Sequence, residues 1–306
     1  MAKQEPTKKR MRVFVTGATG FIGSAVVAEL IRSGHRVLGL ARSDEGAATL
    51  LAAGAEVHRG SIDDLESLRG GAAASDGVIH TAFNHDFSRF KASSEEDRRA
   101  IAAMGEELAD SRRPLVITSA IGLLPPGRLA TENDAVSLGP HASPRVASEQ
   151  AADALVSQGV NVMVIRNAPS VHGRGDHGFV PTLIRIAREK GVSAYVADGS
   201  NRWAAVHRLD AAVLYRLALE EGKAGARYHA VAEQGVLFRD IAGAIGQGLG
   251  VPVLSVPTER ASDNFGTFTH FAAIDVPASS DQTRNQLGWQ PKQPGVIADV
   301  RDGGYF

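Results

Sequence analysis

The sequence feature that most restricts the fold is GATGFIG (17–23), a glycine-rich turn between a short β-branched run and a helical pattern. The run RVFVT (12–16) predicts a strand, and IGSAVVAELIRSG (22–34) has helical spacing and ends on glycine. In such a unit the first glycine permits a tight turn, the second lets the backbone approach a pyrophosphate, and the third lets the helix pack closely on the strand. The unpaired N–H groups and the dipole of the helix start favour an anion. The turn therefore predicts a dinucleotide site, the alternative being a structural turn without a ligand.

The strand–helix alternation continues along the chain. Further buried strands are predicted at 36–41, 55–60, 77–82, 114–120 and 161–166, and helices at 44–54, 63–70, 95–111 and 143–158. Nearly continuous apolar strands that alternate with helices predict an α/β fold, a doubly wound parallel (Rossmann) sheet covered on both faces.

The domain organisation follows from where this regularity weakens. We expect a disordered N-terminal extension at 1–10 and a dinucleotide-binding core at 11–170. We expect residues 171–306 to form a smaller substrate-binding lobe that is interwoven with the core. Within this lobe, a part of the chain at about 227–256 is expected to return to the core.

Composition excludes several other classes of protein. The formal net charge is −1, whereas binding to nucleic acid or an anionic membrane calls for a basic excess. There is no cysteine and no apolar run long enough to span a membrane, and the basic stretch MAKQEPTKKR lacks the apolar h-region of a signal peptide. We therefore expect a cytoplasmic protein without nucleic-acid or membrane partners. No metal site is expected, because His172, Asp176 and His177 fit no established zinc spacing.

The end of the second strand bears on the choice of cofactor. A site for NAD usually carries Asp or Glu there, to bind the ribose 2′-hydroxyl, but this strand is followed by Arg42 and Ser43. A guanidinium and a hydroxyl suit a 2′-phosphate, so NADP(H) is the predicted cofactor. Asp44 and Glu45 leave NAD open as the alternative.

Seven segments between about 11 and 295 together resemble one family. They are TGATGFIG, GSIDD, GVIHTAF, VITSA, IRNAPSVHGRGD, AVHRLDAA and LGWQP. The chain resembles the extended short-chain dehydrogenases/reductases, of the epimerase-like or 3β-hydroxysteroid-dehydrogenase-like kind. The resemblance implies a nicotinamide-dependent enzyme that acts on a carbonyl or hydroxyl group of a small molecule. The cofactor contacts that we expect are Gly17, Thr19, Gly20, Phe21, Ile22, Gly23, Arg42, Ser43, Ser61, Ile62, Thr81, Ala82, Phe83, Thr118 and Pro169.

The chain departs from this family at its catalytic positions. The family carries a Tyr-x-x-x-Lys proton-relay pair, and the matching residues here are Arg145 and Glu149. The usual second hydroxyl of the serine strand falls on Ala120, which leaves Ser119 as the nearest hydroxyl. At i and i+4 on one helix, Arg145 and Glu149 can form an ion pair. We predict that Arg145 binds the substrate oxygen; the alternative is a surface salt bridge without a catalytic part.

The source of the proton is therefore open. The four tyrosines, at 195, 215, 228 and 305, lie outside the serine strand and the helix that follows it. Water, the cofactor ribose hydroxyl or a histidine can supply the proton, and His141 is the favoured histidine because it precedes that helix. His80 is expected to be structural. The predicted catalytic set is Ser119, Arg145, Glu149 and His141.

Several residues of the second lobe predict a substrate site with apolar walls and few polar anchors. They are His172, His177, Phe179, Arg202, Trp203 and His207, and the alternative for Trp203 is a place in the lobe's core. The favoured function is NADPH-dependent reduction of a small-molecule ketone or aldehyde to an alcohol. The alternatives are a catalytically quiet NADP(H)-binding sensor and an epimerase or isomerase. A homodimer is possible in each case.

Overall fold

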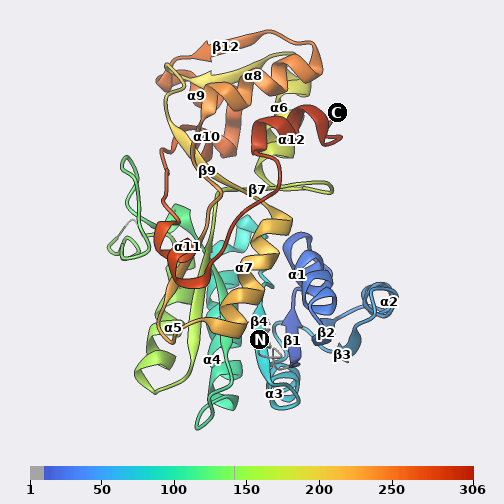
Figure 1. The fold of residues 1–306 in the computed structure, drawn as a ribbon. Coiled ribbons are helices and arrows are strands. Elements are labelled where there is room, and N and C mark those ends of the chain that lie inside the picture. The colour runs from blue at the N-terminus through green and yellow to red at the C-terminus, as the bar shows by residue number, and fades with distance from the viewer. Residues whose placement is uncertain (1–9, 141) are drawn as a thin grey trace, which may run out of the picture.

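The computed structural model describes residues 10–140 and 142–306, and its centre is a seven-stranded parallel sheet (Figure 1). In spatial order the strands are β10 (Arg227–Ala230), β6 (Val162–Asn167), β5 (Leu115–Ala120), β4 (Gly77–His80), β1 (Arg12–Thr16), β2 (Arg36–Ala41) and β3 (Glu56–Arg59). Every neighbouring pair is parallel, so all seven carboxyl ends lie along one edge. The strand order reverses between β1 and β4, the position at which such sheets bind their ligands.

Helices cover both faces of this sheet, as the alternating pattern predicts. On one face α1 (Phe21–Arg32) packs against α7 (Arg208–Glu221), and on the other α4 (Phe90–Glu107) packs between α3 (Leu65–Ala73) and α5 (Ala147–Ser157). The short α2 (Asp44–Ala52) lies beside β2 and β3. The doubly wound α/β fold is confirmed.

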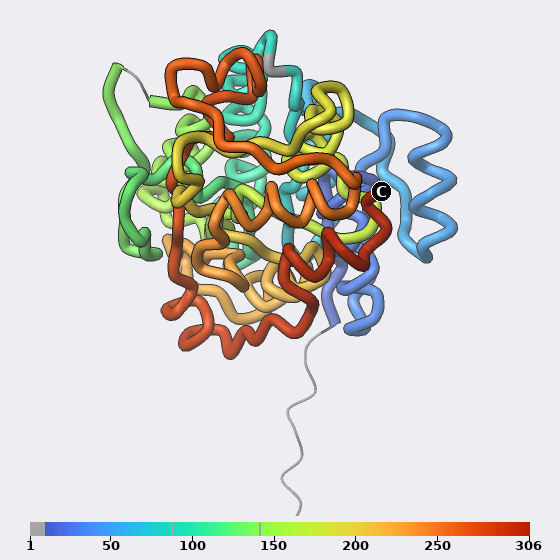
Figure 2. The backbone as a smooth tube through the Cα atoms, turned by 90° about the horizontal axis from the view of Figure 1, so that it is seen from above, coloured from blue at the N-terminus to red at the C-terminus, as the bar shows by residue number. Residues whose placement is uncertain are grey.

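The smaller lobe lies beyond the carboxyl edge of the sheet (Figure 1). Its strands form a three-stranded sheet of β7 (Ser170–His172), β9 (Arg202–His207) and β11 (Glu233–Leu237), and a two-stranded sheet of β8 (Ser193–Val196) and β12 (Val253–Val256). Its helices are α6 (Phe179–Lys190), α8 (Phe238–Leu249), α9 (Ala261–Phe265), α10 (Thr269–Ala273) and α12 (Val296–Asp302), whereas α11 (Asp281–Leu287) packs near α7. Seen from above in Figure 2, the orange and red C-terminal segments lie across the yellow segments that precede them.

The return of the chain to the core is narrower than the predicted 227–256. Strand β10 pairs with β6, and α7 also packs on the core, although we placed it in the substrate lobe. Residues 233–256 stay in the second lobe because β11 pairs with β9 and α8 buries Phe238, Ile241 and Ile245, an apolar stripe with helical spacing, toward β8 and α6.

Candidate active site

Two glycines of the turn after β1 have no space for a side chain. Gly17 has φ +65°, and a Cβ atom there would lie 2.6 Å from the backbone nitrogen of Ala82. A Cβ atom on Gly23 would lie 2.0 Å from the carbonyl oxygen of Gly17. Larger residues would therefore separate α1 from β1 and from the end of β4, as the roles of these glycines in a nucleotide-binding turn require.

The start of α1 is open to an anion. Its N-cap is Gly20, no side chain caps the first turn, and that turn holds no acidic residue. Thr19 and Gly20 are exposed, and Phe21 and Ile22 are partly exposed. Unpaired backbone N–H groups at an accessible helix start are the donors that a phosphate needs. The residues present therefore fit the pyrophosphate of a dinucleotide.

A second accessible group of residues follows β2 and β3. Arg42 and Ser43 are exposed, and the Ser43 hydroxyl oxygen caps α2 by accepting a hydrogen bond from the Gly46 N–H at 3.1 Å. Asp44, the candidate acid for NAD, instead forms an ion pair with Arg59 at 2.5 Å. This arrangement leaves the Ser43 hydroxyl proton available as a donor at the residue next to Arg42.

The turn after β3 adds one more acidic group to this region. The Ser61 hydroxyl donates a hydrogen bond to the Asp63 carboxylate. This bond, with a smaller contribution from the charge of Arg42, lowers the pKa of Asp63. Ile62, between them, is partly exposed. The expected adenosine contacts thus lie together at one end of the carboxyl edge.

The remaining expected cofactor contacts follow β4, β5 and β6. Thr81, Ala82, Phe83, Thr118 and Pro169 are all partly exposed. Two of their hydroxyls serve the backbone, because Thr81 Oγ1 donates to the Thr16 carbonyl and Thr118 Oγ1 to the His80 carbonyl, each at 2.8 Å. A strip of accessible residues therefore continues from the glycine turn along the carboxyl edge.

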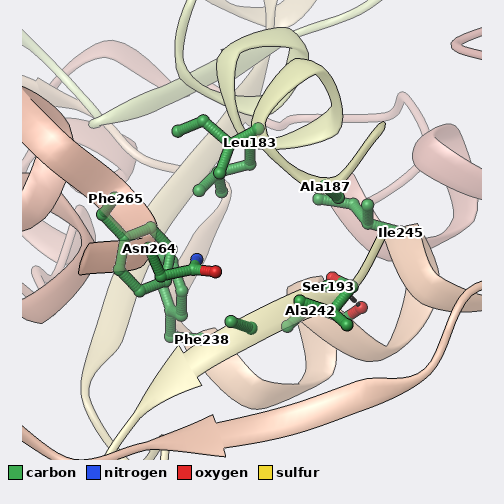
Figure 3. A pocket seen from close by; sticks show the side chains of 11 residues that line it. Leu183, Ala187, Ser193, Phe238, Ala242, Ile245, Asn264 and Phe265 are labelled. Carbon is green, nitrogen blue, oxygen red and sulfur yellow. Dashed lines mark hydrogen bonds between the residues drawn. The ribbon is translucent and has the colours of Figure 1, made fainter. Parts of the chain in front are cut away.

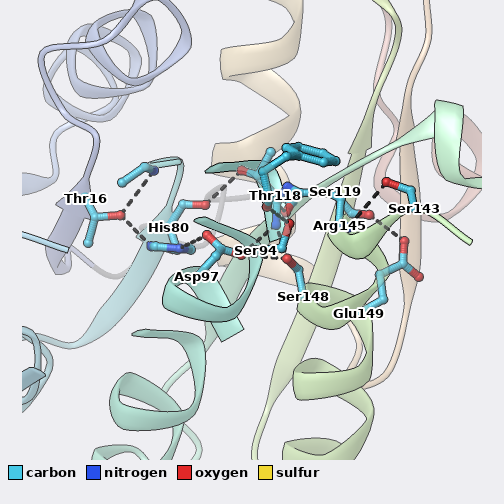
Figure 4. Close-up of polar contacts among 12 residues, drawn as sticks. Thr16, His80, Ser94, Asp97, Thr118, Ser119, Ser143, Arg145, Ser148 and Glu149 are labelled. Carbon is cyan, nitrogen blue, oxygen red and sulfur yellow. Dashed lines mark hydrogen bonds and ion pairs between the residues drawn. The ribbon is translucent and has the colours of Figure 1, made fainter. Parts of the chain in front are cut away.

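Arg145 lies beside this strip, in a short 3₁₀ helix (Pro144–Val146) that precedes α5. Its Nη1 lies 2.6 Å from Asp97 Oδ2 and also bonds the Ser148 hydroxyl, and its Nη2 donates to the Thr118 carbonyl at 3.1 Å (Figure 4). The guanidinium carbon lies 4.1 Å from the centre of the Phe83 ring. These contacts hold the Arg145 guanidinium in one position, between the Phe83 ring and the end of β5.

Glu149 faces a different partner. Its two carboxylate oxygens accept hydrogen bonds from Arg166 at 2.9 and 2.8 Å, and one of them also accepts the Ser119 hydroxyl at 2.6 Å. Burial opposes its ionisation, but Arg166 and Ser119 lower the pKa of Glu149 below the ordinary value. Ser119 and Glu149 are each only 2% exposed.

The predicted ion pair between Arg145 and Glu149 is therefore wrong, and so is its surface alternative. Both side chains are buried, and each binds a separate partner from another element: Asp97 on α4 holds Arg145, and Arg166 on β6 holds Glu149. The spacing of four residues predicted the wrong contact because Arg145 lies in a 3₁₀ turn, ahead of the α-helix that carries Glu149.

Asp97 also connects Arg145 to the cofactor turn (Figure 4). Its Oδ1 lies 3.0 Å from His80 Nε2, and His80 Nδ1 lies 2.7 Å from the hydroxyl of Thr16, the last residue of β1. Burial opposes ionisation of Asp97, yet Arg145 and His80 lower its pKa. His80, which we expect to be structural, is thus buried and has a partner on each ring nitrogen. Sequence reasoning missed Asp97, although its position was a usable signal. This acid precedes the apolar residues Ala100 and Ile101 by three and four positions, which places it on their face of the helix.

The remaining histidines of the predicted catalytic and substrate sites differ in their burial. His172 and His207 are buried, with ring centres 5.4 Å apart, and His172 Nδ1 lies 2.9 Å from Asp299 Oδ2. His177 is exposed, and its ring centre lies 5.7 Å from that of Phe21. His141 lies outside the described residues.

Comparison with known proteins identifies the family. A model described as the NAD dependent epimerase/dehydratase family matches residues 13–232. The chain belongs to this family. It is also 50% identical over 293 residues to an uncharacterised protein of Saccharomyces cerevisiae, which covers 95% of this chain and 98% of the yeast protein.

Membership of this family confirms the resemblance to the epimerase-like extended short-chain dehydrogenases/reductases. Two further proteins are similar to the chain. A 4-hydroxy-2-methyl-3-oxo-4-farnesyl-3,4-dihydroquinoline-1-oxide ketoreductase of Stigmatella aurantiaca is 28% identical over 233 residues, 71% of this chain and 67% of that protein. The crystal structure of the dTDP-glucose 4,6-dehydratase of Streptomyces venezuelae with NAD and TYD bound has a TM-score of 0.75 at 22% identity. It covers 95% of this chain and 96% of that one, a likeness that supports the fold.

Within this family fold, two predicted substrate residues are engaged elsewhere. Trp203 is 0% exposed and packs among Phe179, Phe238 and Phe268, which matches the alternative that it belongs to the lobe's core. Arg202 binds Asp275 with both guanidinium ends, at 2.9 and 2.8 Å. Phe179 stays partly exposed. Trp203 therefore lies in the lobe's core, whereas a substrate contact of Arg202 stays a prediction.

A cavity in the second lobe, between α6 and α8, is too small for a substrate (Figure 3). Its volume of about 10 Å³ suffices for roughly one water molecule. It is lined by Leu183, Ala187, Ser193, Phe238, Ala242, Ile245, Asn264 and Phe265, among others.

Two searches of the described residues bear on other classes of site. Within 10–140 and 142–306, no three or more His, Asp or Glu side chains are grouped so that they could hold a metal ion. None of the helices in these same ranges is both long and apolar enough to cross a membrane.

Proposed function

We propose that this member of the epimerase/dehydratase family is an NADPH-dependent reductase that converts a small-molecule ketone or aldehyde into an alcohol. The single observation that carries the proposal is the fixed position of Arg145, a buried guanidinium held by Asp97 and stacked on Phe83. A preorganised cation at the carboxyl edge of β4 and β5 suits the negative charge that develops on a carbonyl oxygen as it accepts a hydride.

The glycine turn and the start of α1 would hold the pyrophosphate, and Arg42 with Ser43 would hold the 2′-phosphate. The Arg59–Asp44 ion pair supports this choice, because it engages one of the two acids, Asp44 and Glu45, that could otherwise serve a 2′-hydroxyl. When bound, NADPH supplies the hydride. Arg145 then positions the substrate oxygen, and its guanidinium stays charged throughout.

Reduction is favoured over epimerisation because neither Tyr215 nor Glu149 is free to act as the base that oxidation of an alcohol requires. Tyr215 is fully buried on α7, where burial raises its pKa to about 12, and it hydrogen-bonds Thr118 Oγ1 at 2.7 Å and Asn167 at 3.0 Å. Glu149 is occupied by Arg166. The reductase name of the Stigmatella aurantiaca relative also supports reduction.

A catalytically quiet NADP(H)-binding protein is the second candidate. It is favoured by the burial of Ser119 and Glu149, two of the expected catalytic side chains, in an interaction with Arg166. In that case the protein would bind the cofactor without using it to reduce a substrate.

The test separates binding from turnover. Calorimetry with NADPH and NADH measures cofactor affinity, and loss of NADPH absorbance is followed with a panel of ketones, aldehydes and ketoesters. Turnover of at least one carbonyl compound supports the reductase. Tight NADPH binding without turnover of any of them supports the quiet binding protein, and binding of neither nucleotide overturns both proposals.

A further inference from the structure

A histidine that the sequence analysis did not consider lies close to Arg145. His85 follows β4 in the segment that begins with the expected cofactor contacts. Its ring meets the Phe83 ring edge to face, with centres 5.1 Å apart, and Phe83 is the ring on which the Arg145 guanidinium stacks at 4.1 Å. One aromatic side chain therefore contacts both the fixed cation and an imidazole.

The charges around His85 come from three other elements. Arg145 from the 3₁₀ helix, His177 from the segment between β7 and α6, and Asp97 from α4 all act on its ring. The Phe83 backbone also interacts with the ring. Burial by surrounding atoms, followed by the charges of Arg145 and His177, lowers the pKa of His85 below 6.5, although the side chain is exposed. An exposed ring with these neighbours can exchange protons with water.

We propose that His85 donates the proton to the substrate oxygen, in place of the tyrosine that this chain lacks; the inference rests on the proposed reduction. The hydride of NADPH bonds to the carbonyl carbon, and the π electron pair of the C=O bond moves to the oxygen beside Arg145. The oxygen takes a proton from the His85 imidazolium, which leaves an alcohol, NADP⁺ and a neutral imidazole. His85 then regains its proton from water.

The proton donor imposes a pH dependence on turnover. Only the protonated ring can donate, so kcat should be highest at low pH and fall as the pH rises through the pKa of His85. Because that pKa is lowered, the fall should be centred below the ordinary histidine value of 6.5. A general acid contributes about 10²- to 10⁴-fold to a rate.

The experiment compares H85Q with H270Q, an exposed histidine on α10 of the second lobe. We expect H85Q to lower kcat about 100-fold or more, to abolish the fall of kcat with pH, and to leave the NADPH dissociation constant unchanged. H270Q should match the wild type in all three. Wild-type kcat and pH profile in H85Q would overturn the inference while leaving the reductase intact.

A measurement without turnover separates the two proposals. The pKa of His85 is read from NMR titration of its ring in the wild type and in R145K and R145Q. Loss of the positive charge in R145Q should raise the pKa of His85, whereas R145K should keep it close to the wild-type value. An unchanged pKa in R145Q would show that the ring does not face the guanidinium, which overturns the inference whether or not the protein reduces carbonyl compounds.

Discussion

Asp97 Oδ2 lies 2.6 Å from Arg145 Nη1 in the interior of the protein, and the same carboxylate receives His80 on its other oxygen. The pair joins α4 to the turn before α5 across 48 residues of sequence. Because the Thr16 hydroxyl contacts His80, the position of Arg145 depends on the end of β1, where the cofactor turn begins. One buried hydrogen-bond network therefore connects the end of β1, where the cofactor turn begins, to Arg145, the candidate catalytic cation.

The variant D97N should destabilise the protein. Asparagine keeps the shape of the side chain but leaves Arg145 buried without its counter-charge, and breaking such a pair costs about 3–5 kcal/mol of unfolding free energy. Urea denaturation at neutral pH measures the loss. The matched control is E95Q on the same helix, where the exposed Glu95–Arg98 pair contributes at most about 1 kcal/mol. Equal effects of the two substitutions would argue against the buried pair.

The variant R145K should reduce turnover more than binding. Lysine keeps the positive charge but loses the planar fork that reaches Asp97, Ser148 and the Thr118 carbonyl together. We expect kcat to fall by about 10²- to 10³-fold, the usual effect of losing one positioned oxyanion donor. NADPH affinity, measured by calorimetry, should stay unchanged. A normal kcat in R145K would remove Arg145 from the mechanism.

The fold and the cofactor turn could be predicted because their signals are local. Alternating apolar strands and helices specify the sheet, and a glycine such as Gly17 reflects a backbone conformation that is determined within a few residues. The same holds for Arg42, whose place at the end of β2 follows from the strand itself.

The partners within the candidate site could not be predicted in this way. Arg145 and Glu149 are four residues apart, which suggests a mutual contact, but tertiary packing supplies Asp97 and Arg166 from other elements. Trp203 shows the same limit, because its aromatic neighbours come from segments on both sides of it in the chain. Sequence indicates which side chains are unusual, but not which of them meet.

The variant E149Q should change how stability depends on pH. The folded-state pKa of Glu149 is lowered, so the stability contributed by its ionised form is present above the ordinary value of 4.5 and is lost as the pH falls through the lowered pKa. E149Q should therefore be less stable than the wild type at neutral pH, and the difference should shrink in acid. Denaturation curves across this range check the sign. A difference that grows on acidification would contradict the assignment.

The variant R42A should weaken NADPH binding and leave NADH binding nearly unchanged. A charge-assisted hydrogen bond to the 2′-phosphate is worth about 1.5–3 kcal/mol, so the NADPH dissociation constant should rise about 10- to 100-fold. The matched control is R36A, at the opposite end of the same strand, where Arg36 pairs with Glu56 far from the carboxyl edge. R36A should bind both nucleotides like the wild type. Equal losses of NADPH and NADH affinity in R42A would show that Arg42 does not read the 2′-phosphate, and would favour NAD as the cofactor.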